Sequence, residues 1–294
     1  MLSPAETAVV LAVVAAFFYA ASTILVRAGI RESNSLVAMF VSLTVNLVCL
    51  WLVVFTFTDV RIDLWRWRYF ILAGLFAPGV GRLLNYAGID RVGVNIAAPI
   101  VYANPLFSVT AAILLLGERL SPVGLFGGLL VIVGGGLVGS ERGGETLSFK
   151  WYHLLLPVGA ALLYGSSHVI RKVGIDLVGS PLIAAAVTIS TSWLLAAAYV
   201  FGTGVEIDPD RRELTFFSLA GLASSVAIPT LYLALQTGLV VVVTPLMNLS
   251  PLFILALSFL FFRGEEIFSA RILVGTLTVV VGITLLTLYS TTPA

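Results

Sequence analysis

Charged side chains are scarce in this chain of 294 residues, where Asp, Glu, Lys and Arg together make up 11% of the sequence. Soluble globular proteins contain about 25% charged and about 45–50% apolar residues, whereas 59% of this chain is hydrophobic. These proportions exclude an ordinary water-soluble domain and predict an integral membrane protein. The net charge is +1 without a long run of like charges, so nucleic acid is not expected as a partner.

Cysteine and the common catalytic motifs are also nearly absent. The single cysteine, Cys49, lies in an apolar run and has no second cysteine with which to form an internal disulfide. The sequence contains no His-Cys cluster, no H-E-x-x-H motif and no nucleophile elbow. We therefore expect no metal, no cofactor and no enzymatic activity.

Long apolar runs are the main feature that is present. Each is long enough to cross about 30 Å of hydrocarbon at about 1.5 Å per residue. They cover residues 7–26, 36–57, 69–89, 93–116, 121–139, 152–170, 181–201, 216–236, 239–262 and 272–289. The first run follows no basic segment of the kind that begins a signal peptide, so we expect it to be retained. The pattern predicts an all-α integral membrane protein with ten transmembrane helices.

The two halves of the chain share an ordered series of residues at offsets of 145 to 147 positions. The matches include Tyr19 with Tyr164, Ser22 with Ser167, Tyr86 with Tyr232, Pro99 with Pro245, Pro105 with Pro251, and Gly117-Glu118 with Gly264-Glu265. We therefore predict two five-helix repeats, residues 1–146 and 147–294, within one structural unit. Because five is odd, the second repeat must enter the membrane from the opposite side, and such inverted repeats place a transporter's site near the midplane.

Two matched runs, 94–116 and 239–262, each contain a pair of prolines six residues apart. Tyr102 lies between the first pair and Asn248 between the second. Proline removes a backbone donor and bends a helix, which frees carbonyl groups. Such groups are tolerated at membrane depth only inside protein or beside a water-filled cavity. We infer that these helices face each other across an internal site, with Tyr102 and Asn248 at its centre and Pro99, Pro105, Pro245 and Pro251 as hinges.

Arg82 is the only charged residue inside the runs drawn above, and a guanidinium at membrane depth costs about 2.5–3.5 kcal/mol on insertion scales. Asn85 and Tyr86 share its helix face at spacings of three and four residues, and Pro78 precedes it by one turn. The segment from Pro78 to Gly81 predicts a locally opened helix and a further hinge. Arg82 is interpreted either as a clamp for a carboxylate or phosphate or as a side chain that snorkels to the nearer interface.

Other polar residues occur at matched places in the two halves. They are Tyr19 and Ser22 in the first run, Tyr164 and His168 in the sixth, and Tyr232 in the eighth, where Pro229 is a further candidate hinge. Each is interpreted either as a ligand donor or as a hydrogen-bonding contact between helices. His168 could also handle a proton, since histidine titrates near neutral pH. The fifth run is rich in glycine, which indicates close helix packing within the monomer or in a homodimer.

The duplicated five-helix unit resembles the drug/metabolite transporter superfamily in its EamA-type branch. The resemblance rests on the paired prolines in helices four and nine, followed by Leu-Gly-Glu-Arg at 116–119 and Arg-Gly-Glu-Glu at 263–266. It implies solute transport by alternating access through a central cavity lined by helices one, three, four, six, eight and nine. It also implies cytoplasmic termini, whereas the loops opposite the termini carry more Lys and Arg, which favours termini outside.

These features predict a secondary transporter in the cell membrane for small polar metabolites, anionic or zwitterionic, such as amino acids. The expected partners are this small-molecule substrate and membrane lipids. The alternatives are a lipid-linked carrier or flippase and a multidrug exporter of the same superfamily. Proton-coupled export of cations is disfavoured because the first run contains no membrane-embedded Glu.

Overall fold

The computed structural model describes residues 3–30, 33–58, 63–139, 150–261 and 270–289, and this part of the chain contains helices and no strand. The helices are α1 Pro4–Gly29, α2 Ser35–Phe57, α3 Leu64–Gly74, η1 Leu75–Val80, α4 Gly81–Val92, α5 Val94–Tyr102, α6 Asn104–Leu116, α7 Pro122–Gly139, η2 Trp151–Leu154, α8 Leu155–Val178, α9 Pro181–Thr203, α10 Arg211–Thr237, α11 Val240–Met247, α12 Ser250–Phe261 and α13 Ala270–Tyr289. The boundary between residues 146 and 147 and the Gly264-Glu265 motif lie outside the described residues.

These helices form ten membrane segments within the described ranges, which confirms the predicted fold class. Eight segments are long and apolar enough to span a bilayer, and α7 and α13 are shorter apolar helices. Three segments are interrupted: α3 continues through η1 into α4, α5 is followed by α6, and α11 is followed by α12.

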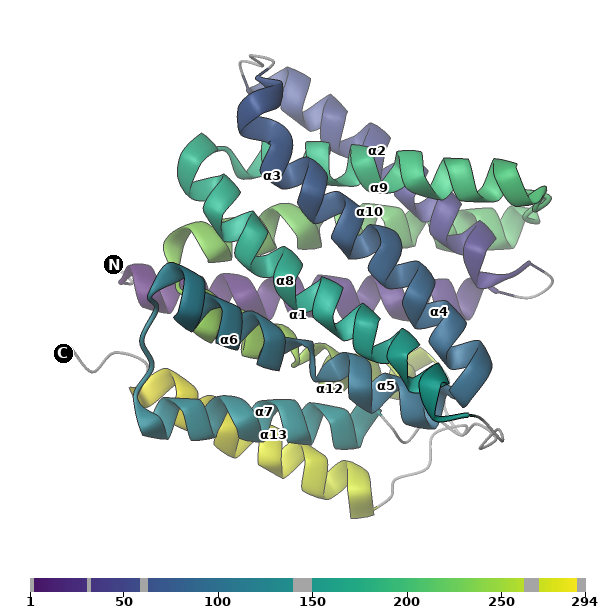
Figure 1. Cartoon of the computed structure of the whole chain (residues 1–294). Coiled ribbons are helices and arrows are strands. Elements are labelled where there is room, and N and C mark those ends of the chain that lie inside the picture. Colours follow the sequence, from purple (N-terminus) through teal and green to yellow (C-terminus); the bar gives the residue numbers. More distant parts are fainter. Residues whose placement is uncertain (1–2, 31–32, 59–62, 140–149, 262–269, 290–294) are drawn as a thin grey trace.

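The two halves are inverted relative to each other. Five crossings separate the start of α1 from the start of α8, and Figure 1 shows α8 starting at the end of the bundle opposite to the one where α1 begins. The contacts follow the same symmetry, because α1 packs on α10 while its repeat equivalent, α8, packs on α3 and α4. The equivalent pair α7 and α13 packs together along one side of the bundle (Figure 1).

Most of the prolines predicted to bend helices lie at the three breaks. The first proline pair flanks the junction of α5 and α6, and the second flanks the junction of α11 and α12. Pro78 lies in η1, where Ala77 and Gly79 have non-helical backbone angles. In contrast, α10 continues through Pro229 without interruption. One missing backbone hydrogen bond does not end a helix that is packed along its length.

Small residues allow the helices to approach closely. Ala8, Ala12, Ala15 and Ala16 lie on one face of α1 and are at most 1% exposed. Their spacing matches the helical repeat, so together they form a smooth stripe for the neighbouring helices. This packing holds the first half of α1 against the bundle and leaves the second half to contribute polar side chains.

The glycines of α7 pack within the monomer against α13. A Cβ atom added at Gly127 would lie 2.6 Å from the backbone nitrogen of Leu286 and 2.7 Å from the carbonyl oxygen of Gly282. At Gly134 it would lie 2.6 Å from the carbonyl oxygen of Gly275. The glycine-rich run therefore forms a helix-to-helix contact rather than part of the site.

Candidate functional site

A cavity of about 190 Å³ lies between the two repeats. Its lining comes from near the middle of eight membrane segments, with no contribution from α7 or α13. The polar and charged lining residues are Tyr19, Ser22, Thr23, Ser42, Asn46, Arg82, Tyr102, Asn104, Tyr164, Ser167, His168, Arg171, Ser224, Asn248 and Ser250. Besides the six helices that the resemblance implied, α2 contributes Ser42 and Asn46, and α9 contributes Ile189.

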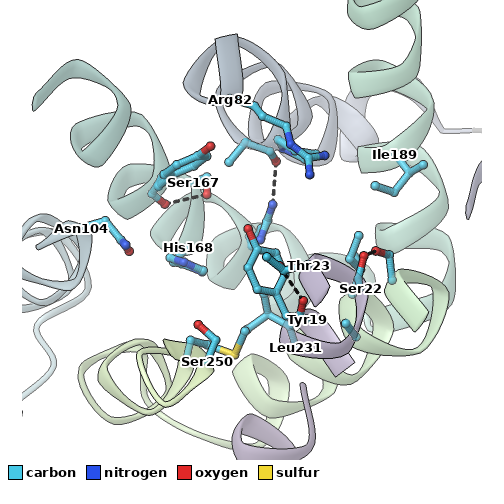
Figure 2. Close-up of a pocket in the computed structure, with 18 of the residues that line it drawn as sticks. Tyr19, Ser22, Thr23, Arg82, Asn104, Ser167, His168, Ile189, Leu231 and Ser250 are labelled. Atoms are coloured by element: carbon cyan, nitrogen blue, oxygen red, sulfur yellow. Dashed lines mark hydrogen bonds between the residues drawn. The ribbon is translucent and has the colours of Figure 1, made fainter. Parts of the chain in front are cut away.

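Most of the residues predicted for the site lie at this cavity. Those in its lining are Tyr19, Ser22, Arg82, Tyr102, Tyr164, His168 and Asn248, together with the candidate hinge Pro78. Figure 2 shows side chains from opposite walls, among them Tyr19, Arg82 and His168, around one space. Three predicted residues, Asn85, Tyr86 and Tyr232, are not part of the lining.

Arg82 reaches the cavity because the helix is opened just before it. The break at η1 ends at Val80, and Arg82 is the second residue of α4. Arg82 is half-buried, and Tyr19 of α1 and Tyr164 of α8 line the same cavity. Arg82 therefore points into a tyrosine-lined space instead of forming an ion pair among the described residues.

Arg171 is the charged cavity residue that the sequence reasoning missed. The interpretation that Arg82 is the only charged residue inside a span is wrong, because Arg171 lies within α8 and is 6% exposed. Its Nη2 donates a 2.6 Å hydrogen bond to the carbonyl oxygen of Ala77, in the opened segment. The contact uses a backbone carbonyl of the opened segment as the acceptor.

The signal that identifies Arg171 is its position on the helix rather than local hydropathy. Tyr164, His168 and Arg171 are spaced i, i+4 and i+7, which places them on one face of α8. The apolar run ends at residue 170, so a boundary drawn from hydropathy excludes the last member of this face. Extending the helix by one turn brings Arg171 to the cavity.

The charges around the cavity are all of one sign. Its charged lining residues are Arg82 and Arg171, and the lining contains no Asp or Glu. The two buried carboxylates of the described residues act elsewhere: Glu118 accepts hydrogen bonds from the start of α11, and Glu213 accepts them from Ser33 and caps α10. The cavity is therefore suited to an anionic group, for which Arg offers a planar set of donors.

The two helix breaks meet directly beside the cavity. The side-chain amide of Asn248 donates a 2.6 Å hydrogen bond to the carbonyl oxygen of Tyr102, its repeat equivalent. Asn104 Nδ2 donates to the carbonyl oxygen of Val101 at 2.9 Å, which satisfies another acceptor at the first break. The inference that the two proline-containing helices face each other across an internal site agrees with this geometry.

The remaining polar side chains of the lining differ in whether they form hydrogen bonds within the protein. The hydroxyls of Ser22 and Ser224 are 2.8 Å apart and link α1 to α10. Ser167 donates to the carbonyl oxygen of Tyr164 at 2.7 Å, within α8. The buried Nδ1 atom of His168 has no hydrogen-bond partner within the described part of the chain.

Tyr232 lies behind the cavity wall. It is fully buried, and its hydroxyl oxygen lies 2.5 Å from that of Thr188 in α9. Its ring packs edge-to-face on Phe70, and the Arg171 guanidinium lies 5.7 Å from the ring centroid. Tyr232 therefore packs beside Arg171 and joins α10 to α9. This position agrees with its interpretation as a hydrogen-bonding contact between helices.

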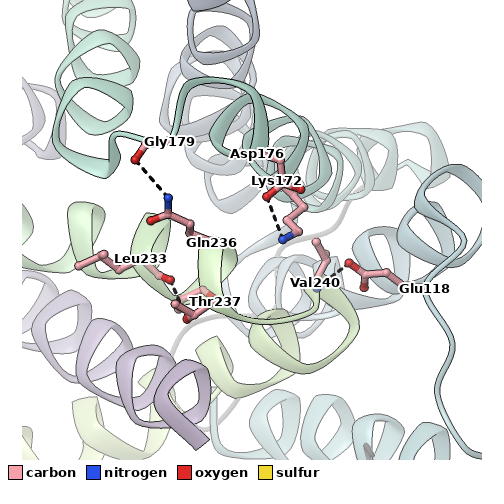
Figure 3. A network of polar contacts seen from close by, with 9 residues as sticks. Glu118, Lys172, Asp176, Gly179, Leu233, Gln236, Thr237 and Val240 are labelled. Atoms are coloured by element: carbon pink, nitrogen blue, oxygen red, sulfur yellow. Dashed lines mark hydrogen bonds and ion pairs between the residues drawn. The ribbon is translucent and has the colours of Figure 1, made fainter. Parts of the chain in front are cut away.

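Polar contacts join the helices at the end of the bundle where α8 and α10 end and α11 begins. Beyond the cavity, α8 continues to Lys172 and Asp176, which form a 3.1 Å ion pair, and α10 continues to Gln236, which donates to the carbonyl oxygen of Gly179 (Figure 3). Glu118 accepts hydrogen bonds from the backbone nitrogens of Val240 and Val241 at 3.0 and 2.9 Å. These contacts anchor the start of α11 at this end.

The equivalent segments of the two repeats are packed differently. In α11, all residues from Val240 to Leu246 are buried. In α5, its repeat equivalent, Ala97 is the only buried residue among those whose side chains the structure describes. The α11 segment is thus more tightly packed than the α5 segment.

Comparison with known proteins agrees with this architecture. The model of the EamA-like transporter family matches the chain twice, over residues 6–140 and 150–288. A crystal structure described only as that of a protein is similar in fold, with a TM-score of 0.82 at 17% sequence identity, covering 97% of this chain and 98% of the other. A search of curated proteins finds no match.

The family model covers nearly the whole chain in two copies, and each copy corresponds to one five-helix half of the fold. The chain therefore belongs to the EamA-like transporter family and is a multi-pass membrane transporter of the drug/metabolite transporter superfamily.

Proposed function

We propose that this protein is a secondary transporter of the cell membrane that moves small polar metabolites, anionic or zwitterionic, by alternating access. The observation that carries the proposal is the cavity near the middle of the spans, with Arg82 and Arg171 in its lining and no carboxylate there. Charged groups at membrane depth are expensive, and they mark substrate pathways when they face a cavity.

The unequal packing of the two repeats supports alternating access. Equivalent segments, α5 and α11, have the same proline pattern but different burial. In an inverted repeat, an exchange of these two conformations would loosen the α11 end and close the α5 end. The helix breaks at Ala103 and Asn248 are the positions at which such a change requires the least disruption of helical hydrogen bonds.

The charge and the size of the cavity argue against two alternative functions, a multidrug exporter and a lipid-linked carrier. A cationic drug needs an acidic partner, and the cavity lining supplies none. A volume of about 190 Å³ also lies below the range of about 300–1,000 Å³ typical of pockets for drug-sized ligands. A small metabolite fits this space better than a drug or a lipid-linked sugar.

The test is uptake by purified protein in proteoliposomes, with a panel of small acidic, neutral and basic metabolites. We expect Arg82→Ala to reduce the transport of the accepted solute by about tenfold or more, because losing one partner of a buried charge contact costs about 2–5 kcal/mol. Arg66→Ala is the matched control, since the Arg66 side chain is 65% exposed and pairs with Asp63 outside the cavity. Folded parent protein that moves no member of the panel would contradict the proposed function.

A further inference from the structure

We propose that the substrate of this cavity is a small dianion, a dicarboxylate or a phosphate monoester, held by Arg82 and Arg171 together. This rests on the proposed function and narrows it, because it excludes zwitterions such as amino acids as preferred substrates.

Arg171 is an incompletely satisfied cation. Arg171 is only 6% exposed, and one of its donors is bonded to the carbonyl oxygen of Ala77. Its buried Nε has no hydrogen-bond partner among the described residues. Buried polar groups are normally hydrogen-bonded, and a buried charge is normally paired. A carbonyl oxygen orients the guanidinium but does not neutralise it, so a bound anion is the missing partner.

Arg82 and Arg171 converge on the same helix break from two different helices. Arg171 reaches across from α8 to Ala77, and Arg82 follows Ala77 by five residues on the other side of that break. Both side chains belong to the lining of the same cavity of about 190 Å³, and Figure 2 shows Arg82 at this space. Tyr164, two turns before Arg171 on α8, packs against the residue before Arg82, because a Cβ atom added at Gly81 would lie 3.0 Å from its ring. One small ligand in this cavity can therefore contact both cations.

The charge balance distinguishes a dianion from a zwitterion. Two guanidiniums in a space of low dielectric repel each other, and this repulsion is larger than it would be in water. A dianion neutralises both, whereas a zwitterion has no net charge and adds an ammonium group that finds no Asp or Glu in the lining. An unpaired ammonium beside two arginines is the kind of mismatch by which a site rejects the wrong ligand.

The test uses ligands that share a four-carbon frame and differ in charge. Binding of succinate, butyrate, 4-aminobutyrate and 1,4-diaminobutane to the purified full chain is measured by calorimetry, and glycerol 3-phosphate is compared with glycerol. A phosphate monoester carries a charge of about −1.5 to −2 at pH 7, so it tests the same property with different geometry. We expect succinate or glycerol 3-phosphate to bind at least about 30-fold more tightly than 4-aminobutyrate and the neutral or cationic probes.

Variants test the two arginines separately. Arg82→Gln and Arg171→Gln should each weaken binding of the preferred dianion by about 30-fold or more, and each should reduce its preference over butyrate. Arg66→Gln, at the exposed end of α3, is the control and should leave the affinity unchanged. Because the ligand series on the parent protein decides the question by itself, a variant that does not fold does not affect the test.

Two outcomes overturn the inference. If 4-aminobutyrate binds as tightly as succinate and glycerol 3-phosphate, or if neither dianion binds, the substrate is not a dianion. Transport of a zwitterion in the proteoliposome panel would then leave the proposed function standing. Absence of transport for every solute would remove the proposed function itself.

Discussion

The side-chain amide of Asn248 donates a 2.6 Å hydrogen bond to the backbone carbonyl of Tyr102, 146 residues away. The two residues occupy equivalent positions in the two repeats, each between a pair of prolines. Proline frees backbone carbonyls at both breaks, and at the first break an amide from the second provides the missing donor. The two repeats are thus joined at the positions where their helices are interrupted and helical hydrogen bonds are missing.

Replacing Asn248 by Ala should destabilise the protein by about 0.6–2 kcal/mol, the range measured for polar contacts between membrane helices. The substitution removes the donor to the Tyr102 carbonyl and leaves that buried group with one partner fewer. The measurement is the unfolding midpoint in detergent, together with uptake in proteoliposomes. An unchanged midpoint and unchanged uptake would show that the joined breaks matter neither for stability nor for transport.

Two adjacent glycines of α7 make a matched pair for testing the contact with α13. Gly127→Ala should destabilise the protein by about 1–3 kcal/mol, as is typical of overpacking, because its Cβ would lie 2.6 Å from a backbone atom of α13. Gly128→Ala should have little effect, since the nearest atom would lie 3.8 Å away. Unfolding midpoints in detergent compare the two. Equal midpoints would contradict the close packing of α7 on α13.

Glu118 should stabilise the start of α11. Its carboxylate accepts two hydrogen bonds from the first turn of α11, where the helix dipole also favours negative charge. Glu118→Ala leaves both buried donors without this acceptor and should cost about 1–3 kcal/mol.

Thermal unfolding measures the effect of Glu118→Ala, and Glu206→Ala, at an exposed position, is the control. If the two variants unfold at the same temperature, Glu118 does not anchor α11.

The fold could be predicted almost completely from the sequence because its signals are long and repeated. Apolar runs of about twenty residues identify membrane helices, and the recurrence of Pro99 and Pro105 as Pro245 and Pro251 identifies the duplication and its two breaks. Pro229 shows the limit of this reasoning, because α10 continues through it. Whether a proline ends a helix depends on packing by its neighbours, which hydropathy does not report.

The site could be predicted only in part. Tyr19, Arg82 and His168 were found because polar residues inside apolar runs stand out. Arg171 was missed because it follows the last apolar residue of its run, although its spacing from Tyr164 places it on the cavity face. Tyr232 matched a polar residue in the other repeat, yet it lies behind the wall, since sequence spacing does not distinguish a ligand contact from a helix contact.

Whether solute occupies this cavity is tested most directly by the accessibility of a cysteine placed in its wall. Ile228 lines the cavity at the position equivalent to Arg82, so Ile228→Cys in a Cys49→Ser background reports on the space itself. Leu194→Cys, on a 61% exposed position in the middle of α9, is the lipid-facing control.

We predict that a water-soluble maleimide labels Ile228→Cys but not Leu194→Cys, and that the solute accepted in the uptake panel slows this labelling. Labelling of Ile228→Cys that proceeds at the same rate with and without saturating solute, or no labelling at all, would contradict a solute-carrying cavity between the two repeats.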